Sequence, residues 1–153
     1  MQMIASVDIG TKNLGYAIWD SSIVDFGVVD LTQFKKGKDY AAMAKALCDT
    51  GIFAKCDTIL IERQMQARMK VLATALRCFF WDKAVLIAPQ SVKRHFKSGT
   101  KKHSTNKKKA VDIVAPFIKD LDKFKALRKK DDVADAILQV LYYVRSRTST
   151  HIA

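Results

Sequence analysis

Three consecutive segments of strand character open the chain, and this order restricts the fold more than any other feature of the sequence. Residues 3–9 and 13–20 are apolar and flank a short turn that contains Gly10, and residues 22–31 follow with alternating character. This pattern predicts a meander of three strands. The segments expected beyond it are a helix over 39–54, a strand over 57–62, a helix over 65–81, a strand over 84–89, a short helical turn from residue 91, and helices over 106–119 and 131–147. The alternation predicts an α/β fold with a mixed five-stranded sheet flanked by helices.

Length and composition favour one soluble domain over residues 1–153. No apolar run approaches the roughly 18 to 20 residues that a membrane span needs, and no secretory signal precedes the first strand. The three cysteines, Cys48, Cys56 and Cys78, are odd in number and widely spaced, which fits neither a disulfide framework nor paired zinc ligands. We therefore expect an intracellular protein with reduced thiols and no membrane partner.

The charge of the chain is strongly positive and unevenly distributed. There are 27 lysines and arginines against 15 acidic residues, a formal net charge of +12. No acidic residue lies between Asp82 and Asp112, and a polar, basic segment over 97–106 is expected to be the least structured part of the chain. The residues predicted to bind nucleic acid are Lys93, Arg94, Lys97, Lys101, Lys102, Lys107, Lys108 and Lys109. A second basic block precedes the last helix and consists of Lys123, Lys125, Arg128, Lys129 and Lys130. The alternatives are a solvated basic surface and binding to an anionic membrane surface, but two basic blocks in so small a chain favour a polyanion such as nucleic acid.

Acidic residues follow two of the apolar strands and begin the last helix. Asp8 and Glu62 each lie at the carboxyl end of a strand, so adjacent parallel strands would place them side by side. Asp131, Asp132 and Asp135 crowd the first turn of the helix over 131–147. On a helical wheel Asp132 lies closer to the apolar face than Asp131, which favours Asp132 together with Asp135 as the partners of the strand carboxylates.

Each of these acids alone has an ordinary structural explanation. Aspartates at a helix start stabilise the helix dipole, Asp8 could be a turn residue, and Glu62 could pair with a neighbouring cation. Four carboxylates that converge would repel one another unless cations joined them, and hard oxygen ligands suit Mg²⁺ or Mn²⁺. Two such ions about 4 Å apart can activate a water and stabilise a leaving alkoxide, which is the chemistry of phosphodiester hydrolysis.

Four segments in this order resemble a known family. DIGTKNLGYA, the strand that ends in LIERQ, the basic loop and the final DDVADA helix together resemble the RuvC-type Holliday junction resolvases of the ribonuclease H-like superfamily, and are most similar to the poxvirus resolvases and their mitochondrial relatives. The resemblance covers nearly the whole chain. It implies that Asp8, Glu62, Asp132 and Asp135 form a catalytic tetrad that binds two Mg²⁺ ions, for which Mn²⁺ substitutes. It also implies a catalytic lysine near the scissile phosphate, for which we favour Lys102, with Lys101 and Lys109 as alternatives.

The resemblance further implies an activity and a setting. It indicates a Mg²⁺-dependent endodeoxyribonuclease that resolves four-way DNA junctions by paired symmetric nicks, in viral recombination and concatemer resolution at cytoplasmic replication sites. A homodimer is implied as well, because paired cuts require two catalytic centres related by a twofold axis. The helix over 65–81 could form the dimer surface, although its apolar stripe could equally face the core.

Three other functions fit part of the sequence. The opening DIGTKNLGYA also resembles the phosphate hairpin of actin-like and sugar-kinase ATPases, but the chain offers neither the length nor a second such hairpin, and no Walker sequence is present, so no nucleotide cofactor is expected. A ribonuclease acting on RNA–DNA hybrid, or a nuclease for other branched DNA, would use the same carboxylates. A non-enzymatic nucleic-acid-binding protein would have no reason to gather them.

Overall fold

The computed structural model describes residues 2–34, 39–98 and 103–149. The strands in this part of the chain are β1 (Ile4–Ile9), β2 (Asn13–Trp19), β3 (Ile23–Asp30), β4 (Thr58–Glu62) and β5 (Ala84–Ile87). The α-helices are α1 (Tyr40–Asp49), α2 (Ala67–Phe79), α3 (Pro89–His95), α4 (His103–Val114), α5 (Leu121–Ala126) and α6 (Lys130–Ser149), with short 3₁₀ turns η1 (Leu31–Phe34) and η2 (Ala115–Phe117). No helix in the described ranges is long and apolar enough to cross a membrane.

The strands form one mixed sheet in the order β3-β2-β1-β4-β5. The meander predicted from the sequence is present, since β1 pairs antiparallel with β2, and β2 pairs antiparallel with β3. On its other side β1 pairs in parallel with β4, and β4 pairs in parallel with β5. The prediction of a mixed five-stranded α/β sheet is confirmed, and β1 and β4 are interior strands as expected for apolar runs buried on both faces.

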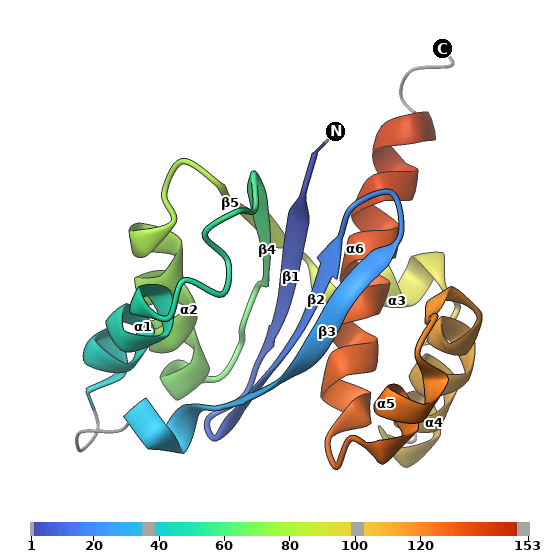
Figure 1. Ribbon diagram of the computed structural model, residues 1–153, viewed down its shortest axis with the longest axis horizontal. Helices are drawn as coiled ribbons and strands as arrows, with labels where there is room; N and C mark the ends of the chain where they lie inside the picture. Colours follow the sequence, from blue (N-terminus) through green and yellow to red (C-terminus); the bar gives the residue numbers. More distant parts are fainter. Residues whose placement is uncertain (1, 35–38, 99–102, 150–153) are drawn as a thin grey trace.

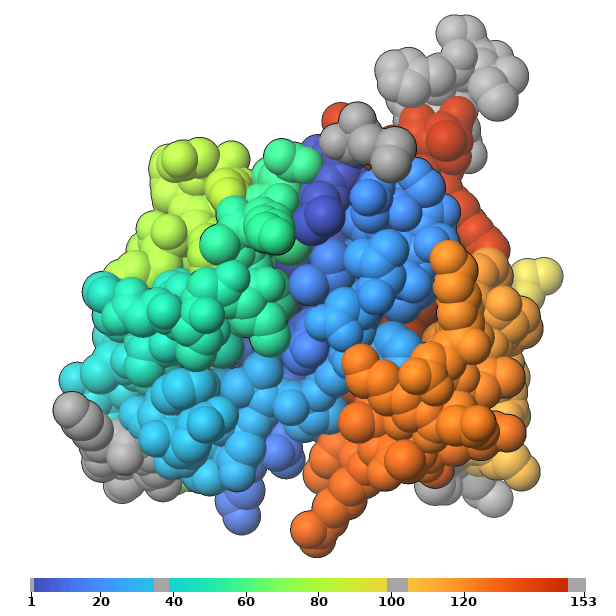
Figure 2. All heavy atoms as spheres, viewed as in Figure 1, coloured from blue at the N-terminus to red at the C-terminus, as the bar shows by residue number. Residues whose placement is uncertain are grey.

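Helices cover both faces of the sheet, as Figure 1 shows: α1 and α2 pack on one face, and α6 with α3, α4 and α5 packs on the other. In the space-filling view the blue strands are visible between the cyan and green α1 side and the orange α5 (Figure 2). Each face has its own hydrophobic cluster. The carboxyl end of β1 and the start of α6 lie at the same end of the molecule (Figure 1).

The alternation of side chains along the strands decides which face receives the acids. Along β1, Ala5, Val7 and Ile9 belong to the cluster under α1 and α2, whereas Ile4 belongs to the cluster under α6. Because successive residues of a strand point to opposite faces, Asp8 lies on the α6 side. The same alternation applies to β4, where Ile59 and Ile61 face α1 and α2 and Leu60 faces α6. Glu62 is therefore on the same face as Asp8.

The region after α3 differs from the sequence prediction. The helix expected over 106–119 begins earlier, at His103, and ends at Val114, because Pro116 lies in the 3₁₀ turn that follows and cannot continue the helical hydrogen bonding. The helix α5 was not predicted. The Asp120 carboxylate caps it by accepting a hydrogen bond of 2.8 Å from the backbone N–H of Lys123, and its Phe124 is buried in the cluster under α6. The three cysteines are free thiols, as expected.

Candidate active site

Asp8 and Glu62 meet at the carboxyl ends of the two parallel interior strands. The register pairs Val7 with Ile61, so the two acids occupy the next position on each strand. Burial raises the pKa of Asp8 well above its ordinary value, and the nearby carboxylates of Asp135, Glu62 and Asp132 raise it further. Burial also raises the pKa of Glu62, although a hydrogen bond with Asp8 and the charge of Lys93 oppose this. The expectation that adjacent strands bring these two carboxylates together is confirmed.

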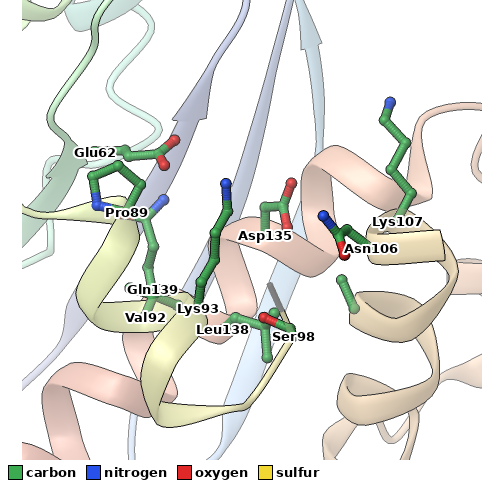
Figure 3. A pocket seen from close by; sticks show the side chains of 11 residues that line it. Glu62, Pro89, Val92, Lys93, Ser98, Asn106, Lys107, Asp135, Leu138 and Gln139 are labelled. Atoms are coloured by element: carbon green, nitrogen blue, oxygen red, sulfur yellow. The ribbon is translucent and has the colours of Figure 1, made fainter. Parts of the chain in front are cut away.

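The helix α6 brings Asp135 to the same place. Asp135 is exposed by its accessible surface. Desolvation by the surrounding protein atoms, followed by the charges of Glu62, Asp132 and Asp131, raises its pKa to about 7, while Lys93 lowers it. Asp135 and Glu62 line a cavity of about 190 Å³ between α3, α4 and α6. In Figure 3 the side chain of Lys93 points toward the opening between these two carboxylates.

The first turn of α6 contains two aspartates in different surroundings. Asp131 forms an ion pair with Lys107 of α4, which leaves its pKa below the ordinary value although burial acts in the opposite direction. Asp132 is half-buried, and burial followed by the charge of Asp131 raises its pKa. Asp132 and not Asp131 therefore contributes to the electrostatic field at Asp8, as the helical wheel predicted.

Gly15 of β2 allows the start of α6 to lie directly against the strands. Gly15 of β2 is the register partner of Asp8. A Cβ atom at Gly15 would lie 2.5 Å from the backbone carbonyl carbon of Asp132 and 2.6 Å from its carbonyl oxygen. The absence of a side chain at this position thus sets the distance between the start of α6 and the strand that contains Asp8.

Gln139 is a site residue that the sequence reasoning missed. It lies one turn after Asp135 on α6, lines the same cavity, and is 3% exposed. Its Nε2 donates a hydrogen bond of 3.2 Å to the backbone carbonyl of Val7, and its buried Oε1 has no hydrogen-bond partner among the described residues. The available signal was a polar residue at a helical spacing of four from Asp135, within an otherwise apolar stripe.

The predicted basic residues fall into three groups. Lys93 and Lys107 line the cavity that contains Glu62 and Asp135. Nζ of Lys109 donates a hydrogen bond of 3.1 Å to the backbone carbonyl of Lys97 and is therefore directed along the surface next to the cavity. Lys109 belongs to the second group, which consists of exposed residues that do not line the cavity: Arg94, Lys97, Lys108 and Lys109. The favoured catalytic residue Lys102 and its alternative Lys101 lie outside the described residues.

The donor atoms of the site are carboxylate oxygens, which are the ligands that Mg²⁺ and Mn²⁺ prefer. Asp8 experiences the charges of Glu62, Asp132 and Asp135, which shows that the four carboxylates converge. Within the described ranges, however, no three histidine, cysteine or acidic side chains are grouped closely enough to hold one metal ion in this conformation. Chemically the set fits a hard divalent cation, and binding one requires the carboxylates to move closer together.

The order of the strands and the position of the acids define a RuvC-like fold of the ribonuclease H-like class. The chain matches the family described as "Poxvirus A22 protein" over residues 2–147, and it belongs to that family. The structure is similar to the Fowlpox virus resolvase in complex with substrate Holliday junction DNA, with a TM-score of 0.73 at 20% identity over 95% of this chain and 98% of the other.

Two further structures share the fold. A crystal structure of the Fowlpox virus Holliday junction resolvase has a TM-score of 0.71 at 19% identity, over 95% of this chain and 99% of the other. RuvC of Thermus thermophilus has a TM-score of 0.60 at 14% identity, over 96% of this chain and 98% of the other. Comparison with the curated proteins gave no match.

Proposed function

We propose that this protein is an endonuclease that resolves four-way DNA junctions by paired symmetric nicks, in the recombination and concatemer resolution of a viral genome. The observation that carries the proposal is the convergence of Asp8, Glu62, Asp132 and Asp135 from β1, β4 and α6 next to a cavity lined by lysines. The family and the similarity to a resolvase described with its Holliday junction substrate support the choice of DNA over RNA.

The same four carboxylates would hold two Mg²⁺ ions, or Mn²⁺ in their place. Bound there, the ions would supply an activated water and charge stabilisation for the leaving oxygen. The raised pKa values of Asp8 and Asp135 support this assignment, because burial together with the neighbouring carboxylates favours protons that a bound cation would displace.

The lysines of the cavity would hold and orient the phosphate. Lys93 lies between Glu62 and Asp135 in the view of Figure 3, and Lys107 is fixed on the opposite wall by its ion pair with Asp131. Ammonium groups on two sides of a phosphodiester fix its position and offset its charge as the nucleophile approaches. Lys102 remains our candidate for direct assistance in catalysis, and Lys101 and Lys109 remain the alternatives.

Paired nicks further require two copies of the site, and we propose a homodimer. The predicted apolar stripe of the helix over 65–81 divides in the structure: Leu72 and Leu76 are buried in the core, whereas Phe79 is 46% exposed. Val71 at 52% and Trp81 at 69% are exposed near it. Apolar side chains that the fold leaves exposed on α2 and just after it support this surface as the contact between copies. The proposed place of action is the cytoplasmic site of viral replication.

Cleavage of a labelled immobile four-way junction tests the activity. Linear duplex and an RNA–DNA hybrid serve as competing substrates, with and without Mg²⁺, for the wild type and for Asp8→Asn. We expect paired symmetric nicks in the junction only, which require Mg²⁺ and disappear in Asp8→Asn while junction binding persists. Cleavage of the hybrid alone would move the substrate to RNA, and tight binding without cleavage in Mg²⁺ or Mn²⁺ would show a non-enzymatic binding protein.

A further inference from the structure

A second cavity adjoins the candidate active site on the α2 side of Glu62. It has a volume of about 210 Å³ and is lined by Glu62, Arg63, Gln64, Lys70, Ala73, Thr74, Arg77 and Leu86. Glu62 is the one residue that also lines the cavity containing Asp135. The two cavities therefore share Glu62 as a lining residue at the carboxyl end of β4, where a strand that leaves the first cavity around the end of the sheet would reach the second.

Three cations line the second cavity. Arg63 directly follows Glu62, and Lys70 and Arg77 project from α2 seven positions apart, which places them on one face of the helix about 10 Å apart along its axis. All three side chains are exposed. None of them forms an ion pair with any residue in the described ranges, and Glu62 is the only acid among the lining residues. Arg77 lies over the Trp81 ring, 5.4 Å from its centroid, which limits its freedom.

This arrangement matches the backbone of a single nucleic-acid strand. Consecutive charges along one strand of duplex DNA advance by about 3.4 Å, so the separation of Lys70 and Arg77 corresponds to about three nucleotide steps. Arginine and lysine contacts to phosphate oxygens are the usual means by which a protein fixes the register of DNA. A solvated helix surface would more commonly carry acids among its basic residues, and this face of α2 has none at the lining positions.

We infer that Arg63, Lys70 and Arg77 form a binding site for the phosphodiester backbone of the DNA strand beyond the cleavage position. The inference rests on the proposed nuclease function and extends it. Of the basic residues predicted from the sequence, Lys93 of α3 and Lys107 of α4 line the cavity on the other side of Glu62. The DNA strand would thus be held on both sides of the carboxylates. Lys93 and Lys107 would hold it on one side, and Arg63, Lys70 and Arg77 on the other.

The test is the salt dependence of junction binding in EDTA, where no cleavage occurs. The variants are Arg63→Gln, Lys70→Gln, Arg77→Gln and the triple variant. Their binding to a labelled four-way junction is measured by fluorescence anisotropy between roughly 50 and 200 mM salt. The charge-preserving variant is Lys70→Arg. Lys55→Gln is the matched control, since Lys55 is an exposed lysine in the turn before β4, at the opposite end of that strand from Glu62.

The slope of log K against log salt is negative, and each lost phosphate contact makes it shallower by about 0.9. The slope of the triple variant should therefore be shallower by between about 2 and 3 units. Lys70→Arg and Lys55→Gln should keep the wild-type slope. A triple variant that is folded by circular dichroism and has the wild-type slope would overturn the inference. If the slopes fall on linear duplex and junction alike while no substrate is cleaved in Mg²⁺, the phosphate site stands and the proposed nuclease function fails.

Discussion

Gln139 in the middle of α6 donates a hydrogen bond of 3.2 Å from its Nε2 to the backbone carbonyl of Val7, the residue that precedes Asp8. This bond joins two parts of the chain that supply carboxylates to the same site, because Asp135 lies one helical turn before Gln139. It therefore fixes the position of α6 along β1. The free Oε1 of the same amide is buried at the wall of the cavity, where it could accept a hydrogen bond from a water.

Replacing Gln139 with leucine should change the free energy of unfolding little but weaken metal binding at the site. The variant loses one buried hydrogen bond and also removes an unpartnered buried oxygen, so the free energy of unfolding should change by less than about 1.5 kcal/mol. The loss of the link between α6 and β1 should weaken Mn²⁺ affinity by about tenfold or more, as seen for residues that orient metal ligands. Denaturant titration and isothermal titration calorimetry measure the two effects. Gln66→Leu, at an exposed position before α2, is the control, and equal Mn²⁺ affinity in both variants would contradict the role of Gln139.

Gly15→Ala should damage the site through the backbone of α6. The new Cβ would meet the carbonyl carbon of Asp132 at 2.5 Å, so α6 must shift away from β2, at a cost of about 1 to 3 kcal/mol in the free energy of unfolding. Cleavage should fall by at least tenfold, because Asp132 and Asp135 move with the helix. The measurements are denaturant titration and single-turnover cleavage.

Gly51→Ala provides a control of similar stability for that variant. Gly51 has a φ of +72°, and a Cβ there would meet nothing within 4 Å. The substitution should cost about 1 kcal/mol through backbone strain alone and leave cleavage unchanged. Loss of cleavage in both variants would mean that lower stability, and not the approach of α6, explains the effect at Gly15.

The stability of the metal-free protein should depend on Asp135 in a defined pH range. The folded-state pKa is about 7, well above the ordinary value of 3.8, so the folded state binds more protons than the unfolded state between these values. Its contribution to stability must therefore decrease as the pH rises from about 4 to about 7. Asp135→Asn removes this effect, and in EDTA at pH 8 it should be more stable than the wild type. Because Asp135 is exposed, solvent screening limits the gain to about 1 kcal/mol or less.

Thermal unfolding of both proteins in EDTA from pH 4 to pH 8 checks this dependence. The difference in melting temperature should grow through the same range in favour of Asp135→Asn. Saturating Mg²⁺ should reverse the order, because only the wild type retains the full set of carboxylates. A constant difference across the pH range would show that Asp135 does not titrate there.

Lys93→Gln should reduce catalysis more than binding. Lys93 lines the cavity beside Glu62 and Asp135 and lowers the pKa of both. Without this charge we expect single-turnover cleavage to fall by tenfold or more, while junction affinity changes by less than about threefold, since one phosphate contact among many is lost. Arg94→Gln is the neighbouring control, because Arg94 is exposed and does not line the cavity. Equal losses of cleavage in both variants would exclude a specific role for Lys93.

Much of the fold could be predicted because local pattern and tertiary structure agree. The apolar runs that became β1 and β4 indicated interior strands, and their adjacency then placed Asp8 beside Glu62. A helical wheel of α6 placed Asp132 closer to the buried face than Asp131, because amphipathic periodicity indicates which side of a helix is buried.

The remainder depends on contacts between distant segments. Gln139 has an obvious role only when α6 is laid against β1, and α5 is too short for periodicity to identify. The cations Arg63, Lys70 and Arg77 are spread over the sequence, so a search for basic runs does not find them. They become a group because α2 follows directly from the end of β4.

The site uses the first strand and the last helix of the chain together. Two of the four carboxylates, Asp132 and Asp135, come from α6, and the same helix supplies Val133, Ile137 and Leu141 to the core that covers β1. During synthesis on the ribosome, a nascent chain that already contains Asp8 and Glu62 has neither the remaining acids nor the apolar helix that buries that face of the sheet. A chain that ends before α6 therefore contains only two of the four carboxylates and leaves that face of the sheet uncovered, so the site and the core on that side are completed in the same step.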